Sequence, residues 1–332
     1  MPLNIAIIHI IYKKNGCKLS PVSLYPQNLD IFWRMPKYPY FCRAFENMEN
    51  QRENRIISNF RNVKFRQSIP AFVILFVTGL VFLCLGGSFL ENYTHVQIPL
   101  FKKINHALSI MPGLEWNLTE AGNALIGISL LAPLLYFAPA IWGAMFDSLL
   151  IALGLTELLK TIFSMPRPAA VIDRADFTII GPTLTANSLP SGHSITLFVF
   201  ITVLIIAFFP QVKARWKKEV WVAGMVAGMF FVALSRVACG AHWPLDVLTG
   251  SATGCIFAIS GILLDRKFPI WKWMTKDKFT PVLLGMAVLL LVLMVSYITG
   301  HKIQPVYLLA VLSIIITIVC LTRKQISSRK AR

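Results

Sequence analysis

Long apolar runs are the feature of this sequence that most restricts its fold. A helix needs roughly 20 mostly apolar residues to cross the hydrocarbon core of a bilayer. Because backbone groups in lipid must be hydrogen-bonded within the protein, such runs predict transmembrane helices rather than open strands. The predicted spans are residues 70–90, 122–142, 144–163, 193–210, 219–236, 246–265, 281–299 and 305–322.

The composition supports this interpretation. Of the 332 residues, 56% are hydrophobic and only 14% are charged. In a soluble domain, about a quarter of all residues are charged. The sequence therefore predicts an all-α, polytopic membrane protein. The six cysteines show no CxxC spacing, so we expect neither a disulfide framework nor a metal site.

The basic residues indicate the orientation of the chain. The net charge is +17, from 32 basic and 15 acidic residues. Basic residues gather before residue 70, at 211–218, at 266–280 and after 322. Eight alternating spans place these four segments on one side, and Lys and Arg accumulate in cytoplasmic loops. We therefore expect both termini in the cytoplasm and interpret the excess charge as topology rather than nucleic-acid binding.

Three parts of the chain are expected to differ in role. Residues 1–69 form a basic cytoplasmic N-terminal segment that we expect to be partly disordered, and the stretch before Met48 looks dispensable. Residues 70–265 form a core, and residues 266–332 add two transmembrane helices with a basic cytoplasmic tail.

Three polar clusters fall on the outer side in this topology. They are KTIFSMPRP (160–168) at the outer end of the third span, PSGH (190–193) at the outer start of the fourth, and SRVACGAHWPLD (235–246) between the fifth and sixth. Because the topology brings all three to the same face and a similar depth, they can line one pocket at the membrane surface.

The residue types in these clusters suit a phosphate group. Lys160, Arg167 and Arg236 are three cations without a matching cluster of carboxylates. An arginine presents a planar fork that fits phosphate, and a lysine supplies a point charge. Ser191 and Gly192 begin a predicted helix, where free N–H groups and the helix dipole favour an anion.

Two histidines complete the predicted site. His242 and Asp246 are four residues apart and share a face of a helical turn. A carboxylate bonded to one ring nitrogen fixes the tautomer and leaves the other nitrogen able to attack or to take a proton. His193 is then the candidate general acid for the leaving oxygen.

In this order, the patterns K-x6-RP, PSGH and SR-x5-H-x3-D resemble the signature of the type 2 phosphatidic acid phosphatase (PAP2) superfamily. The resemblance covers about residues 70–265 and implies a six-helix core. It also implies that His242 is the nucleophile of a phosphohistidine intermediate, that Asp246 orients it and that His193 protonates the leaving group. By the same resemblance the phosphoryl oxygens are held by Lys160, Arg167, Ser191, Gly192 and Arg236, and neither a metal nor another cofactor is required.

The expected function is therefore hydrolysis of a phosphomonoester or diphosphate on a lipid, at the outer face of the cell membrane. Phosphatidic acid, phosphatidylglycerophosphate, undecaprenyl diphosphate and the phosphates of lipid A remain open as substrates. A transporter is a second possibility, but it predicts polar residues near the bilayer midplane, whereas the charges here cluster at one boundary. A non-catalytic, lipid-phosphate-binding protein of the same fold is a third, although both histidines and Asp246 are present.

Overall fold

The computed structural model describes residues 51–84, 89–210 and 212–330, and the regular elements in these ranges are all helical. The all-α prediction is thus confirmed. Most of the predicted N-terminal segment, residues 1–50, lies outside the described residues. Residues 48–332 form one compact unit.

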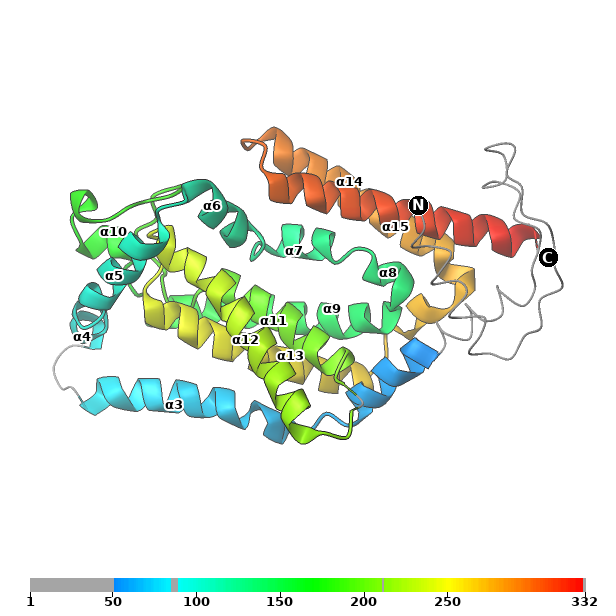
Figure 1. The fold of residues 1–332 in the computed structure, drawn as a ribbon, viewed down its shortest axis with the longest axis horizontal. Coiled ribbons are helices and arrows are strands. Elements are labelled where there is room, and N and C mark those ends of the chain that lie inside the picture. The colour runs from blue at the N-terminus through cyan, green and yellow to red at the C-terminus, as the bar shows by residue number, and fades with distance from the viewer. Residues whose placement is uncertain (1–50, 85–88, 211, 331–332) are drawn as a thin grey trace, which may run out of the picture. The chain divides into compact units, whose positions relative to one another are not determined.

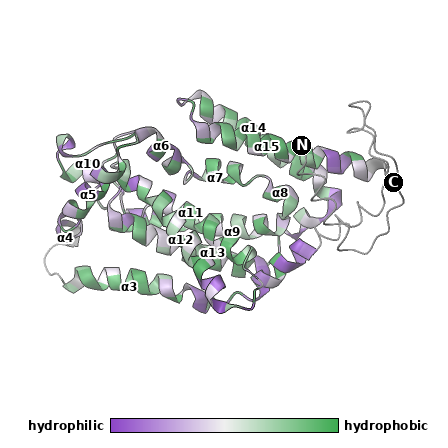
Figure 2. Ribbon diagram, viewed as in Figure 1, coloured by the Kyte–Doolittle hydropathy of each residue, from purple (hydrophilic) through white to green (hydrophobic). Residues whose placement is uncertain are grey.

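Six helical segments in the described part are long and apolar enough to cross a membrane. A seventh apolar helix, α11, is shorter at 16 residues. Hydrophobic residues predominate along the helices that run together in Figure 2, and hydrophilic residues gather towards their ends. The main helices are α3 (Ile69–Cys84), α9 (Pro139–Phe163), α11 (Gly192–Ala207), α12 (Arg215–Ala238), α13 (Pro244–Lys267), α14 (Thr280–Thr299) and α15 (Pro305–Lys330).

The prediction that residues 122–142 form one continuous transmembrane helix is wrong. The chain forms α7 (Ala124–Leu130) and α8 (Leu134–Phe137), and α9 begins already at Pro139 rather than at 144. Pro133 and Pro139 lie where the helices break, because a proline lacks the backbone N–H and its ring clashes with the preceding turn. A hydropathy profile alone does not reveal such helix breaks. The short helices still run in the direction opposite to α9, so the chain reverses as expected (Figure 1).

Short helices connect the segments at the end opposite the basic loops. They are α4 (Phe89–His95), α5 (Ile98–Leu108) and α6 (Pro112–Glu120), together with α10 (Pro168–Val171) in the link between α9 and α11. In Figure 1 these four elements lie together, beside the start of α11 and the end of α12.

Helix α13 is the most enclosed of the long helices, and its glycines explain why. A Cβ atom on Gly250 would lie 2.6 Å from the backbone oxygen of Ser191, and one on Gly254 would lie 2.5 Å from that of Ile195. Glycines in this position let two helix backbones approach closely. The packing of α13 on α11 therefore fixes the start of α11 against the start of α13.

The basic segments meet at one end of the bundle. Arg266 donates hydrogen bonds to the backbone oxygens of Arg61 and Val63, at 3.0 and 2.9 Å. The Asn59 side chain donates to the oxygen of Ala207 at the end of α11, and Lys324 pairs with Asp277 at 2.8 Å. These contacts bring the N-terminal lead-in, the two basic loops and the last helix together, which matches the grouping predicted from the charges.

The last two helices, α14 and α15, pack against the interrupted segment. Ile126 of α7 lies in one core with Met294 of α14 and with Tyr307 and Ala310 of α15. The Ser313 hydroxyl donates to the backbone oxygen of Leu130 at 2.8 Å. The helix pair therefore covers the place where the chain is broken by prolines.

Candidate active site

The structure brings the three polar clusters together at the end of the bundle opposite the basic loops. Lys160 lies in the last turn of α9 and His193 in the first turn of α11. His242 lies in the short turn between α12 and α13, and Asp246 lies in the first turn of α13. The backbone N–H of Ser191 donates to the backbone oxygen of Asp246 at 3.1 Å, which ties the second cluster directly to the third.

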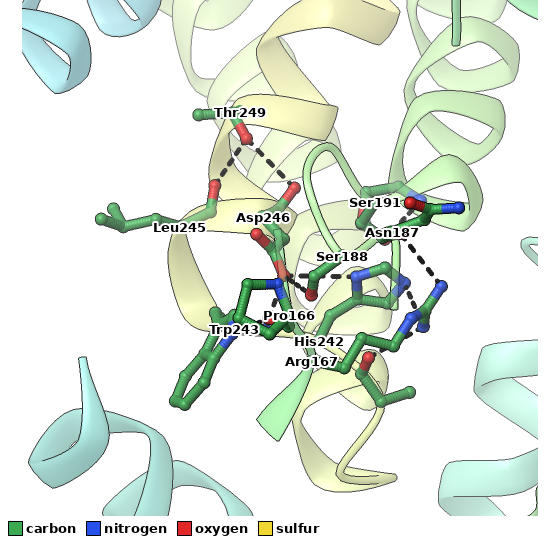
Figure 3. Close-up of polar contacts among 12 residues, drawn as sticks. Pro166, Arg167, Asn187, Ser188, Ser191, His242, Trp243, Leu245, Asp246 and Thr249 are labelled. Carbon is green, nitrogen blue, oxygen red and sulfur yellow. Dashed lines mark hydrogen bonds and ion pairs between the residues drawn. The ribbon is translucent and has the colours of Figure 1, made fainter. Parts of the chain in front are cut away.

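His242 lies between a carboxylate and a guanidinium (Figure 3). Its Nδ1 is 3.3 Å from Asp246 Oδ2, and its Nε2 is 3.1 Å from Arg167 Nη1. An ionised carboxylate only accepts hydrogen bonds, so Nδ1 carries the proton and Nε2 presents its lone pair. Burial, together with the charges of Arg167 and Arg236, lowers the pKa of His242 well below its ordinary value. The imidazole is therefore neutral, and its unprotonated Nε2 accepts a hydrogen bond from Arg167 Nη1.

Asp246 is fully buried and held by several donors. The backbone N–H of Trp243 donates to Oδ2 at 2.8 Å, and the Ser188 hydroxyl donates to the same oxygen. The Tyr93 hydroxyl donates to Oδ1 at 2.7 Å. A buried carboxylate with this many donors is fixed in orientation, and it fixes the ring of His242 in turn.

Arg167 is buried and makes most of its hydrogen bonds to backbone oxygens. Its Nε donates to Ala186 at 2.7 Å, its Nη1 to Ala241 at 2.9 Å and its Nη2 to Asn187 at 3.3 Å. With His242 as a further partner of Nη1, one of the five guanidinium hydrogens, on Nη2, has no partner among the described residues. Arg167 thus joins the first cluster to the second and third and keeps one donor for a ligand.

The start of α11 is built as expected for an anion site, but Ser191 has a different local role. Its side-chain oxygen accepts from the backbone N–H and the hydroxyl of Ser194, so it caps the helix. The first N–H groups of a helix have no partner within it, and those of Gly192 and His193 occupy this position. Lys160 Nζ would lie 3.7 Å from a Cβ on Gly192. The lysine ammonium and the helix start therefore face the same point.

Arg236 completes the cationic group. It is buried in the last turn of α12, and its Nη1 donates to the Thr119 hydroxyl at 3.3 Å. Its backbone oxygen accepts from the N–H groups of Ala241 and His242, which sets the turn that carries the nucleophile candidate. His193 lies within electrostatic reach of Arg236, Arg167 and Lys160. The eight predicted residues thus lie near one another, and both their membership of an active site and their individual roles stay predictions.

Several residues at the site had no signal in the sequence. Tyr93 lies in α4, more than 150 residues before its partner Asp246. Ser188 lies two residues before the start of the PSGH motif, and Thr119 lies in α6. Gln97 accepts from the backbone N–H of Leu245 at 2.8 Å and donates to the oxygen of Tyr93 at 2.7 Å. Such neutral polar residues in loops and short helices become informative only once the fold places them.

An apolar groove leads away from the site. Its cavity volume is about 400 Å³, and its polar end is lined by Lys160, Gly192 and His193. From there it runs between α7, α9 and α11. Leu150 and Leu153, which line it on α9, are 58% and 71% exposed, so the groove is open along the outer surface of α9. The apolar lining consists mainly of Ile128, Phe146, Leu149, Leu150, Leu153 and Ile195.

Parts of the chain are similar to known proteins. Residues 142–270 match the model of the PAP2 superfamily. An undecaprenyl-diphosphatase of Sulfolobus acidocaldarius is 27% identical over 203 residues, which is 60% of this chain and 92% of that protein. A lipid A 1-phosphatase of Rhizobium etli is 30% identical over 107 residues, or 32% of this chain and 42% of the relative.

Two further proteins are similar to the chain. A lipid A 1-diphosphate synthase of Escherichia coli is 26% identical over 125 residues, which cover 35% of this chain and 48% of that protein. The crystal structure of Aquifex aeolicus LpxE matches with a TM-score of 0.42 and 25% identity, over 51% of this chain and 95% of that one. The chain thus spans less than half the length of the lipid A relatives and nearly all of the undecaprenyl-diphosphatase.

Proposed function

We propose that this chain, which belongs to the PAP2 superfamily through residues 142–270, is a membrane lipid phosphatase that hydrolyses a phosphate or diphosphate group on a lipid. The observation that carries the proposal is the position of His242. Its neutral ring is oriented by Asp246, and its Nε2 faces the Arg167 guanidinium. An apolar groove leads away from Lys160 and His193.

The proposed reaction proceeds in two steps. His242 Nε2 attacks phosphorus, an N–P bond forms, and the P–O bond to the leaving group breaks while His193 donates a proton to the departing oxygen. Water then attacks the phosphohistidine, releases phosphate and returns the nitrogen lone pair, with His193 taking the proton of the water. Attack by an oriented histidine followed by acid–base exchange is ordinary nucleophilic catalysis.

The charge that develops on the phosphoryl oxygens is proposed to be stabilised by Lys160, Arg236, the remaining donor of Arg167 and the start of α11. Such pre-oriented donors contribute most in a site shielded from water. We propose that no metal is required, because Lys and Arg side chains supply the positive charge. This proposal is supported by the donor set, since no group of three or more metal-ligating side chains occurs among the described residues.

The groove supports a lipid with at least one long hydrocarbon chain. Because it is open along Leu150 and Leu153, a chain can enter sideways from the bilayer and leave the phosphate at Lys160 and His193. We propose a polyprenyl diphosphate such as undecaprenyl diphosphate as the first candidate, since the relative of that name aligns over 92% of its length. The phosphates of lipid A are the second candidate, followed by phosphatidic acid and phosphatidylglycerophosphate.

The site is proposed to lie at the outer face of the membrane, with both termini in the cytoplasm. The supporting observation is that the basic segments meet at the other end of the bundle, and basic loops remain cytoplasmic. Reporter fusions after Arg174 should report outside, and fusions after Lys218 or Lys278 inside. A cytoplasmic signal from the 172–189 loop would contradict the orientation without touching the chemistry.

The activity is tested with the purified full-length chain in detergent or nanodiscs, presented with the four lipid phosphates. Phosphate release from at least one lipid, retained in excess EDTA and inhibited by orthovanadate, is the expected result. His242→Ala should abolish both turnover and any acid-labile phosphoenzyme. Lipid binding without phosphate release by the wild type would point instead to a non-catalytic protein, and loss of activity on chelation, restored by Mg²⁺, would contradict metal independence.

A further inference from the structure

The end of α6 and the start of α7 connect the site to the two C-terminal helices. On one side, the Thr119 hydroxyl accepts hydrogen bonds from Arg236 Nη1 and from the Ser235 hydroxyl, at 3.3 and 3.1 Å. A Cβ on Gly122 would lie 2.9 Å from the Cβ of His193. This segment, residues 119–123, is thus in contact with a proposed phosphate-binding residue and with the proposed general acid.

On the other side, the same segment is held by tyrosines of α14 and α15. Glu120 Oε2 accepts hydrogen bonds from the hydroxyls of Tyr297 and Tyr307, both at 3.0 Å. The Asn123 side chain donates to the hydroxyl of Tyr297 at 3.4 Å. Glu120 and Tyr307 are buried, so the carboxylate is shielded and depends on these donors. Hydrogen bonds to a charged, buried group are among the strong ones.

The position of Glu120 matters because of its neighbour Arg236. The two residues lie within electrostatic reach of each other. Thr119, which precedes Glu120 in the chain, accepts a hydrogen bond from Arg236 at 3.3 Å. Arg236 is buried, and its Nε has no hydrogen-bond partner among the described residues. A carboxylate that turned towards this donor would form a buried ion pair and occupy the guanidinium. In the structure the carboxylate oxygen Oε2 is bound by the two tyrosine hydroxyls instead.

We propose that Tyr297 and Tyr307 are positioning residues that hold Glu120 away from Arg236, so that the Arg236 guanidinium stays open for the phosphoryl group. This inference rests on the proposed phosphatase function, and it gives the two C-terminal helices a part in the site. In this proposal the helices act on the phosphate-binding side chains through Glu120.

The test compares Tyr297→Phe/Tyr307→Phe with the wild type in the full-length chain. Without the two hydroxyl donors Glu120 turns to Arg236 and competes with the phosphoryl group. We expect the inhibition constant of orthovanadate to rise about tenfold or more, and kcat/KM to fall by a similar factor. Tyr136→Phe is the matched control, because it removes a hydroxyl at the far end of the same interface, near Lys324. It should change both quantities less than twofold.

A rescue variant separates positioning from mere packing. Adding Glu120→Gln to the double variant keeps an acceptor at this position but removes the charge that attracts Arg236. Vanadate affinity should then return to within about threefold of the wild type. If the double variant binds vanadate like Tyr136→Phe, or if Glu120→Gln deepens the defect, the inference is overturned.

The outcomes also distinguish this inference from the proposed function. A wild type that neither releases phosphate nor binds vanadate would contradict the phosphatase itself, whereas an active wild type with an unaffected double variant contradicts only the role of the tyrosines. If the double variant does not fold, as judged by gel filtration and thermal unfolding, Tyr297→Phe decides the question with and without Glu120→Gln. For this single variant we expect a smaller rise of the inhibition constant of orthovanadate, about threefold. Adding Glu120→Gln should again restore vanadate affinity.

Discussion

The Tyr93 hydroxyl donates a hydrogen bond of 2.7 Å to Asp246 Oδ1, on the carboxylate whose other oxygen faces His242. Burial and the charge of Asp246 raise the pKa of Tyr93 well above its ordinary value, so the hydroxyl stays a donor at any physiological pH. Tyr93→Phe removes this donor and loosens the carboxylate. We predict a loss of about tenfold in kcat with little change in KM, measured on the lipid substrate.

The control for Tyr93→Phe is again Tyr136→Phe, because Tyr136 lies far from Asp246. The free energy of unfolding should also fall by about 1.5–3 kcal/mol, because a buried charged acceptor loses a partner. A variant with a raised KM and an unchanged kcat would show that Tyr93 acts on substrate binding rather than through Asp246.

Substrates with different leaving groups can distinguish the roles of the two histidines. A general acid contributes roughly 10²–10⁴-fold and matters most for a poor leaving group. His193→Ala should therefore damage turnover of a lipid phosphate strongly and of p-nitrophenyl phosphate much less, since p-nitrophenolate leaves readily without a proton. Equal damage on both substrates would contradict the assignment of His193 as the acid. A phosphate trapped on His193 would reverse the two roles.

The depressed pKa of His242 has a consequence for the pH dependence of activity. Burial and the charges of Arg167 and Arg236 disfavour the protonated form of His242. As the pH falls, His242 therefore becomes protonated only at a lower pH than an exposed histidine, whose pKa is about 6.5. The acid limb of kcat/KM that belongs to His242 should lie clearly below pH 6.5. A nucleophile that titrates at or above 6.5 would show that the cations do not act on it as described.

The same shift affects stability with a definite sign. Below about pH 6.5 the unfolded chain takes up a proton at this histidine, whereas the folded chain does not. Stability is therefore lost as the pH falls from about 6.5 towards the folded pKa. Between pH 6.5 and 5.5 this amounts to about 1 kcal/mol. His242→Gln should remove this part of the pH dependence, and thermal unfolding of both proteins across the range measures it.

The close approach of α13 and α11 predicts a sharp difference between two glycines. A Cβ on Gly250 would lie 2.6 Å from the backbone oxygen of Ser191, whereas nothing lies within 4 Å of one on Gly224. Gly250→Ala should cost about 1–3 kcal/mol of stability by overpacking and reduce activity, because it displaces the start of α11. Gly224→Ala should be neutral or slightly stabilising, since alanine is the better helix former. Thermal unfolding and activity together check both.

Much of the site was predictable because its chemistry lies in short, ordered motifs. The spacing of His242 and Asp246 predicted the pairing that the structure shows, and the basic loops predicted which segments meet at one end. The apolar runs predicted the helical fold. These features depend on local spacing or on the sum of many residues, which the sequence displays directly.

Other features depend on tertiary contacts or on backbone geometry. The span at 122–142 reads as continuous by hydropathy, but Pro133 and Pro139 interrupt it. The sequence predicts Ser191 as a phosphate ligand, and the structure adds that its side-chain oxygen caps α11. Tyr93 and Glu120 reach their partners only through the packing of segments more than a hundred residues apart.

The proline-interrupted segment also constrains the order in which this membrane protein can mature. Residues 131–138 leave the ribosome about 150 residues before α14 and α15. Peptide groups at a helix break are costly in lipid unless protein covers them. The bond from Ser313 to the oxygen of Leu130 forms only after α15 has been inserted. We therefore expect the nascent chain to keep this segment at the translocon or in contact with water until α15 is inserted, so that α15 completes the bundle and does not merely extend it.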